Sequence, residues 1–154
     1  KELLHYDPST GVFTRLAFGR GPKALIGKPA GNAHCRGYRE LQVDGRAYLA
    51  HRLAWFYMTG LWPKEEIDHL NGSRSDNRWS NLREATKALN MQNRKGPDRD
   101  NKSGFLGVSK HGSGFRAQIA VDGKVYRLGT HRSPEAAHQA YLDAKRKLHD
   151  GNTL

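Results

Sequence analysis

The sequence predicts an α+β protein assembled from hairpins that each lead into a helix. Two stretches share this order: β-favouring residues flank an Asp-Gly pair, and a segment with helical spacing of apolar residues follows. The pairs are Asp44-Gly45 and Asp122-Gly123. Because hydrophobic residues make up only 36% of the 154 residues, several small modules are favoured over one large core.

Residues 1–60 predict an N-terminal β-rich module that ends in a helix. Gly11–Phe18 and Tyr38–Val43 are rich in β-favouring residues, and Arg46–Leu49 follows the Asp-Gly turn. The intervening stretch Gly19–Arg36 is rich in Gly, Pro and Lys, which predicts a loop with room for one short strand.

The helix of this module is predicted from Leu49 to Gly60, where apolar residues recur at helical spacing. Gly60, with Pro63 just beyond it, is a typical helix stop. His51 lies at the start of this apolar helix, which favours a structural role over a catalytic one.

Residues 61–94 predict a central module with the order strand, loop, strand and helix. A strand within residues 66–72 leads into a polar loop through Asp76-Asn77-Arg78, and a second strand lies within residues 81–85. Thr86 is a suitable N-cap for a short helix that contains Asn90.

A linker over residues 95–102 and a last module over residues 103–149 complete the predicted organisation. Residues 93–103 contain no large apolar side chain, so we expect an extended, basic segment. In the last module, strands over residues 116–121 and 124–128 precede a helix that runs to about His149. Ser133-Pro134-Glu135 supplies an N-cap, a proline at the first helical position and an acid in the first turn.

The charge distribution predicts a polyanionic partner, with nucleic acid first. The net charge is +11; residues 1–60 hold 9 basic and 4 acidic side chains, residues 61–100 hold 8 and 7, and residues 101–154 hold 9 and 4. The excess of basic side chains in residues 1–60 and 101–154 suits contacts with phosphates. Residues 61–100 keep carboxylates that a metal ion would need. A solvated basic surface is the alternative interpretation.

Several protein classes are excluded by composition. A single cysteine, Cys35, cannot form an intramolecular disulfide or a Cys-x-x-Cys zinc knuckle, so disulfide scaffolds and cysteine-rich zinc fingers are excluded. No stretch approaches the roughly 18 apolar residues of a membrane span, and residues 1–7 lack the apolar core of a secretory signal. We expect a soluble protein in a reducing, intracellular compartment.

Over residues 38–94 a series of short motifs occurs in a fixed order. The motifs are Asp68-His69, Asn71-Gly72, Asp76-Asn77-Arg78, Asn81-Leu82-Arg83 and Asn90, with the upstream segments His51–Trp55, Gly60 and Trp62-Pro63. This series resembles the HNH endonuclease family, in particular its phage- and intron-associated homing type. The resemblance implies a ββα-metal fold, a divalent-metal cofactor and an origin in a phage or mobile element, with a cytoplasmic location.

The resemblance also implies a role for each matching residue. Asp68 and Asn90 would be metal ligands, His69 the general base, and Asn81 the residue that holds the loop and orients the histidine. The family is named for a His-Asn-His pattern, and the final position of that pattern is Asn90 here.

The chemistry of these residue types agrees with the implied roles. Carboxylate and amide oxygens are hard ligands that suit Mg²⁺ or Mn²⁺, whereas zinc would favour more nitrogen or sulfur. A neutral imidazole can accept a proton from water at physiological pH. For Asn81 an amide that only stabilises a turn remains an equal alternative, because asparagine commonly bonds to backbone.

The last module contains four characteristic segments, Ser103–Val108, Phe115–Ile119, Tyr126–Thr130 and Ala136–Tyr141. Together they resemble the APETALA/ethylene-response-factor DNA-binding domain. It implies a three-stranded antiparallel sheet, backed by a helix and laid in the major groove of DNA. The candidate DNA-binding residues are Lys110, Arg116, Lys124 and Arg127, together with Arg94 and Lys95 beside the linker. Phe115 stands where that family usually has tryptophan.

Together these observations predict a site-selective, metal-dependent endonuclease that cleaves double-stranded DNA and nicks one strand as a monomer. No membrane and no protein partner are implied. A non-catalytic DNA-binding regulator on a nuclease scaffold is the main alternative, and a protein that binds or cleaves RNA is a third. The strands lack the abundance of aromatic residues that stack on unpaired bases, which disfavours RNA.

Overall fold

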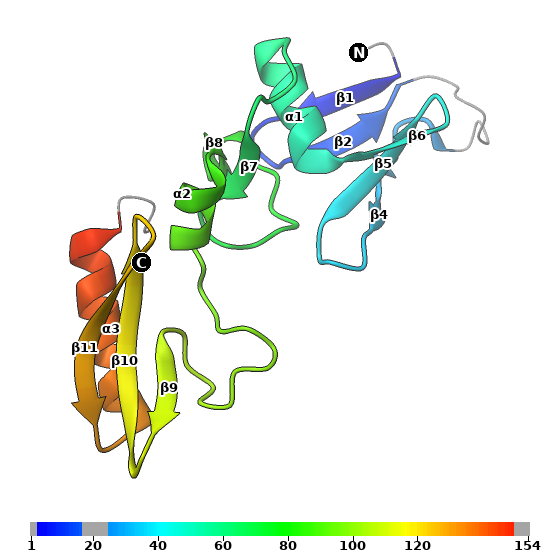
Figure 1. The fold of residues 1–154 in the computed structure, drawn as a ribbon. Coiled ribbons are helices and arrows are strands. Elements are labelled where there is room, and N and C mark those ends of the chain that lie inside the picture. Colours follow the sequence, from blue (N-terminus) through cyan, green and yellow to red (C-terminus); the bar gives the residue numbers. More distant parts are fainter. Residues whose placement is uncertain (1–2, 17–24, 150–154) are drawn as a thin grey trace. The chain divides into compact units, whose positions relative to one another are not determined.

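Figure 1 shows the computed structural model of the protein, which describes residues 3–16 and 25–149. The chain divides into two compact units, Lys1–Thr86 and Lys87–Leu154. Among the described residues, two three-stranded sheets and one two-stranded sheet belong to the first unit, and a further three-stranded sheet belongs to the second. Within the described ranges, no helix has the length and apolar character needed to cross a bilayer.

The first sheet contains β1 (Leu4–Asp7), β2 (Val12–Arg15) and β3 (Pro29–Ala30), all antiparallel. β1 was not predicted, because four residues are too few to establish a period, although Leu4 and Tyr6 are buried on either side of exposed His5. The predicted run Gly11–Phe18 contains β2, and its last two residues, together with 19–24 of the predicted loop and 1–2 of the N-terminal segment, lie outside the described residues.

The second sheet contains β4 (Asn32–Ala33), β5 (Arg39–Val43) and β6 (Arg46–Leu49), and it leads directly into α1 (Ala50–Thr59). The predicted Asp-Gly hairpin is confirmed, since Asp44 and Gly45 both have positive φ, at 49° and 77°, as a two-residue type I′ turn requires. The region predicted as a loop with one short strand contains two, β3 and β4.

The end of α1 also agrees with the prediction. Gly60 adopts the left-handed conformation with φ of 77°, and its N–H donates to the carbonyl of Phe56. Such a residue closes the last helical turn at little steric cost only because glycine has no Cβ. The chain can therefore leave α1 and enter the central strands.

The central residues form β7 (Glu66–His69), a loop that ends in the short 3₁₀ turn η2 (Trp79–Asn81), β8 (Leu82–Ala85) and α2 (Lys87–Gln92). The predicted order of strand, loop, strand and helix is thus present, and β7 and β8 pair antiparallel. Because α2 belongs to the second unit, the packing of a complete ββα-metal core stays a prediction.

The core of the first unit joins all three of its sheets to α1. Its buried residues are Leu4, Tyr6, Phe13, Ala30, Leu41, Ala50, Leu53, Ala54, Ile67 and Leu82. The rings of Phe13 and Tyr57 meet edge to face with centroids 5.4 Å apart, which favours a specific packing of β2 on α1. One core therefore supports both the N-terminal hairpins and the central strands.

The second unit contains β9 (Val108–His111), β10 (Gly114–Val121) and β11 (Lys124–His131), in the spatial order β11-β10-β9, with α3 (Pro134–Leu148) packed on the sheet (Figure 1). This is the predicted antiparallel sheet with a helix. The N-cap is confirmed, since the Ser133 hydroxyl accepts from the N–H of Ala136 at 3.2 Å. Its buried core is small, with Val108, Ala117 and Ala137 at the centre.

The segment predicted as an extended linker is instead held against this second unit. The Nζ of Lys145, which is only 1% exposed, donates to the carbonyl of Arg94 at 2.6 Å, and the Asn101 side chain donates to the carbonyl of Phe105 at 3.1 Å. Asn93 is buried as well. The absence of apolar side chains was not decisive, because polar side chains satisfy the backbone here. The two compact units divide after residue 86. The predicted modules 1–60, 61–94 and 103–149, with a linker over 95–102, stay a prediction.

Candidate active site

Asp68 and His69 lie side by side at the end of β7, and both are buried, at 6% and 4% exposure. The register of β7 and β8 places Asp68 directly opposite Arg83. Arg83 donates to Oδ2 of Asp68 from Nε at 3.0 Å and from Nη2 at 2.8 Å. Charge-assisted hydrogen bonds of this kind orient the carboxylate. Asp68 is therefore fixed beside His69 before any ligand binds.

The imidazole of His69 is oriented by Asn77. Nε2 of His69 lies 3.3 Å from Oδ1 of Asn77, and the amide nitrogen of Asn77 donates to the carbonyl of Ser75 at 3.3 Å. With the amide nitrogen used there, Oδ1 is an acceptor, so Nε2 of His69 carries the proton and Nδ1 is the basic nitrogen of the neutral ring.

Burial is the main cause that lowers the pKa of His69, although the hydrogen bond to Asn77 and the charge of Asp68 oppose it. The positive charge of Arg74 lowers the pKa further. A lowered pKa keeps the imidazole neutral at pH 7, which is the state in which it can accept a proton.

The loop between β7 and β8 is tied together by Asn81. Its Oδ1 accepts from the N–H of Asn71 at 2.9 Å, and its amide nitrogen donates to the carbonyl of Asp76 at 2.8 Å. The backbone of Asn81 also accepts from the N–H of Leu70 at 2.9 Å. Asn81 thus holds the loop at both ends, while the imidazole of His69 donates a hydrogen bond to Asn77.

A second brace within the loop is Asp76. Its carboxylate accepts from the Asn71 side chain at 2.7 Å and forms a salt bridge with Arg78. The hydrogen bond from Arg78 is the largest cause that lowers the pKa of Asp76 to about 2. This carboxylate is committed to loop structure.

The first hairpin supports the same loop from outside. The hydroxyl of Tyr6 donates to the carbonyl of Asn77 at 2.7 Å, and the N–H of Trp79 donates to the carbonyl of Pro8 at 2.9 Å. Gly11, with φ of 73°, lies so close that a Cβ would be 2.4 Å from the backbone of Asn77 and of Arg78. Only glycine permits this approach.

Sequence reasoning missed these supporting residues. Asn77 belongs to the motif Asp76-Asn77-Arg78, so this motif could have indicated that Asn77 has a role in the site. Tyr6 and Gly11 gave none, because their contacts span about 70 residues of chain.

His51 is buried at 5% exposure, and its ring meets that of His69 edge to face at 5.1 Å, so its structural role stays a prediction. Tyr38 contacts both imidazoles, with ring centroids 5.0 Å from His51 and 6.0 Å from His69. Burial is the largest cause that lowers the pKa of His51 to about 3, followed by the charge of His69. Its Nδ1 is buried without a hydrogen-bond partner.

The predicted metal ligands lie in different units, because Asp68 is in β7 and Asn90 is half-buried in α2. Their joint role stays a prediction. In the part of the chain that the structure describes, there is no cluster of three or more His, Cys, Asp and Glu side chains that could hold a metal ion. Mg²⁺ commonly uses one or two carboxylates together with phosphate oxygens and water, so Asp68 fits this ion better than zinc.

The candidate DNA-binding residues of the second unit divide between the two faces of its sheet. Phe115 packs with the core, and the register pairs it with Lys110, while Lys124 pairs with Val121 at the hairpin turn. By alternation along β10, Arg116 points to the face that α3 leaves open, and so does Gln118, whose partner is Arg127.

Arg94 and Lys95 follow α2. The guanidinium of Arg94 forms a salt bridge with Asp98 at 2.7 Å, and Lys95 is exposed. Arg94 therefore already uses its charge within the unit.

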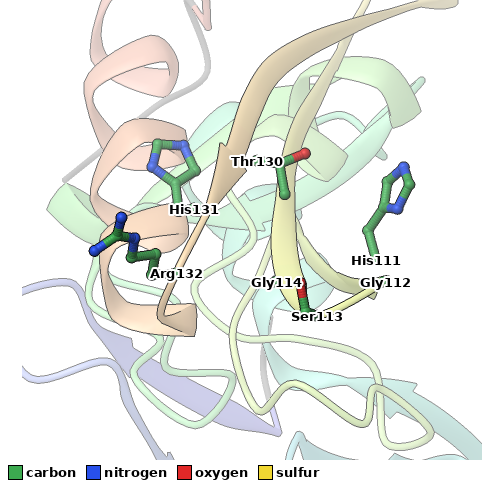
Figure 2. Close-up of a pocket in the computed structure, with 7 residues that line it drawn as sticks. All are labelled: His111, Gly112, Ser113, Gly114, Thr130, His131 and Arg132. Atoms are coloured by element: carbon green, nitrogen blue, oxygen red, sulfur yellow. The ribbon is translucent and has the colours of Figure 1, made fainter.

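A hollow of about 420 Å³ lies at one end of this sheet. Figure 2 shows the residues that line it, His111, Gly112, Ser113, Gly114, Thr130, His131 and Arg132. His131 pairs with Phe115 and lies on the side of α3, whereas Thr130 pairs with Arg116 on the open face. The polar side chains thus point away from one another, and they form no convergent ligand site (Figure 2).

Comparison with known proteins assigns the family of the central residues. Residues 48–92 match the sequence model of the HNH endonuclease family. No curated protein and no solved structure matched the chain. The chain therefore carries an HNH endonuclease domain at these residues, which indicates a nuclease that acts on DNA. No match supports the resemblance of residues 103–149 to the APETALA/ethylene-response-factor domain, which stays a prediction.

Proposed function

We propose that the chain is a site-selective, metal-dependent DNA endonuclease of the homing type, which nicks one strand of a duplex as a monomer. One observation carries the proposal: a buried, oriented imidazole, His69, adjoins a carboxylate held by Arg83, within the segment that matches the HNH family. These two side chains supply a base and an oxygen ligand, the two functions that hydrolysis of a phosphodiester requires.

In this proposal Nδ1 of His69 accepts a proton from the attacking water, while Asn77 keeps the ring in the required tautomer. Asp68, with Asn90, would hold Mg²⁺ or Mn²⁺. A bound ion of this kind stabilises the negative charge on the phosphate and on the leaving 3′ oxygen. Water adds to phosphorus and the bond to the 3′ oxygen breaks, so one strand is cut at each event.

The sheet of the second unit is the proposed reader of the DNA sequence. Its open face carries Arg116, Gln118 and Arg127, and arginine and glutamine side chains can make bidentate hydrogen bonds to base edges. A three-stranded sheet of this kind would lie in the major groove. Lys110, Lys124 and Lys95 would contact phosphates.

Incubation of supercoiled plasmid with the protein and Mg²⁺ tests the proposal. We expect open-circular product that is absent with EDTA and absent for His69→Ala. Sequencing of the ends cut from a random duplex library would then show whether cleavage is site-selective. If DNA binds but is never cut with Mg²⁺ or Mn²⁺, the chain is better described as a DNA-binding regulator on a nuclease scaffold.

A further inference from the structure

Arg74 lies in the loop between β7 and β8 and is exposed to solvent. Its Nη1 donates to the carbonyl of Arg36 at 3.0 Å, and its Cζ lies 5.1 Å from the centroid of the Tyr38 ring. Both partners come from the turn between β4 and β5, so one segment far from Arg74 in the sequence holds this side chain at two points.

The charge of Arg74 is available to a ligand. In the described ranges Arg74 forms no salt bridge, whereas Arg78 of the same loop is paired with Asp76 and Arg83 is paired with Asp68. Guanidinium groups carry five donors, and the hydrogen bond to Arg36 uses only one nitrogen. The remaining donors suit a bidentate contact with phosphate oxygens.

The position of Arg74 is close to the proposed chemistry. The ring of Tyr38, over which the guanidinium lies, also contacts His69, with centroids 6.0 Å apart, and His51. The charge of Arg74 is near enough to act on His69. Successive phosphates of one strand are closely spaced. The guanidinium of Arg74 can therefore contact a phosphate of the same strand that His69 is proposed to cleave.

We propose that Arg74 binds a phosphate of the cleaved DNA strand, and that Tyr38 is the positioning residue that holds Arg74 beside His69. This inference rests on the proposed nuclease function and extends it. The turn between β4 and β5 then completes the active site, although the family match begins only at residue 48. In this proposal the N-terminal hairpins contribute to the active site as well as to the basic charge of residues 1–60.

Nicking of supercoiled plasmid at saturating protein separates this role from general affinity, because the rate then no longer reports binding. Arg74→Ala should lower the rate by about 10²-fold, as loss of a donor to a developing charge does elsewhere, and Arg74→Lys should recover part of it. Arg46→Ala is the matched control. It removes an exposed arginine of the same unit at the far end of β5 from Tyr38, and it should leave this rate unchanged.

The role of Tyr38 is tested by the ring itself. Tyr38→Phe keeps the aromatic face and should cleave like wild type, whereas Tyr38→Leu should cleave about two- to fivefold more slowly, the size of an exposed cation–π contact. The variant with both Tyr38→Leu and Arg74→Ala should be no slower than Arg74→Ala alone, because both changes remove one interaction. Additive losses would overturn the positioning role.

A binding measurement in EDTA provides a readout that needs no cleavage. Arg74→Ala should reduce the slope of log affinity against log salt concentration by about one, as loss of one phosphate contact does. An unchanged slope, or a cleavage rate within threefold of wild type, would overturn the role of Arg74. A wild-type protein that binds DNA but never cleaves it would refute the proposed function, and the salt slope would still decide whether Arg74 contacts phosphate.

Discussion

The two units differ in how they hold the polar side chains that are proposed to act on DNA. In the first unit, the polar residues of the site are buried and held by partners from three hairpins, so that Asn77 and Asn81 are 3% and 6% exposed. In the second unit the sheet keeps one face open, and Gln118 and Arg127 are exposed. Hydrolysis of a phosphodiester requires catalytic side chains that are held in one position. Recognition of bases requires exposed side chains that can form hydrogen bonds with base edges in a groove.

The cores differ in the same sense. Among the residues that the structure describes, the core cluster of the first unit has ten buried residues. The cluster of the second unit has three, and Ile119 and Tyr141 are buried there as well. The first unit therefore has the apolar burial to support a loop of buried polar groups. The second relies more on hydrogen bonds such as that from Lys145 to Arg94.

The largest expected effect is a loss of nicking on substitution of His69 in the first unit. His69→Ala should lower nicking by about 10²–10⁴-fold and leave DNA affinity nearly unchanged, because the imidazole acts on water and does not hold phosphate. Single-turnover nicking and fluorescence-anisotropy binding measure the two quantities. Cleavage within threefold of wild type would remove His69 from its proposed role.

The ligand assignments predict a change in metal dependence. Asp68→Ala and Asn90→Ala should each raise the Mg²⁺ concentration for half-maximal nicking by about 10- to 100-fold. Asp68 also loses its bond with Arg83, so circular dichroism should verify that the fold persists. An unchanged metal requirement for both variants would place the metal site elsewhere in the chain.

The support of the loop by the first hairpin can be tested with two glycines. Gly11→Ala should destabilise the first unit by about 2 kcal/mol more than Gly45→Ala, because both residues have positive φ but only Gly11 abuts backbone. Thermal unfolding gives the two losses. Equal losses would mean that the contact of Gly11 with the loop contributes nothing beyond the backbone conformation.

The two faces of the sheet in the second unit should contribute differently to DNA binding, one to sequence discrimination and the other to affinity for any duplex. Arg127→Ala should reduce discrimination between target and scrambled duplex by about tenfold, since it lies on the open face with Gln118. Lys124→Ala should weaken both duplexes alike, as a phosphate contact does. Affinities for the two duplexes across a salt series distinguish these outcomes. Equal loss of discrimination in both variants would refute the division of the faces.

The smallest effect concerns the buried lysine of the second unit. Burial is the main cause that lowers the pKa of Lys145 to about 8, from an ordinary value of 10.5. Above about pH 8 the unfolded chain therefore binds more protons than the native chain. The burial of Lys145 lowers the free energy of unfolding by its full amount below that pH and by less as the pH rises.

The stability of wild type relative to Lys145→Met should accordingly increase by about 1 kcal/mol between about pH 7.5 and 9.5. Hydrogen exchange of core amides in β10 measures this for the second unit alone. A difference that does not change with pH would show that Lys145 keeps its ordinary pKa.

The sequence by itself determined the local elements and the chemical identity of the site. Asp44-Gly45 and Asp122-Gly123 specify two hairpins because both residues of each pair adopt positive φ, and Ser133 and Gly60 specify a helix start and a helix end. Asp68 and His69 were recognisable because adjacent residues stay adjacent in any fold. Such features depend only on neighbours along the chain.

Tertiary structure alone decided which distant residues support them. Tyr6, Tyr38 and Arg83 reach the site through sheet pairing and core packing, which no local pattern encodes. The segment after α2 was expected to be free because it lacks apolar residues, yet Lys145, 51 positions away from Arg94, anchors it. Hydrogen bonds between distant residues form only once the hydrophobic cores have brought their segments together, and this is the physical reason they could not be predicted.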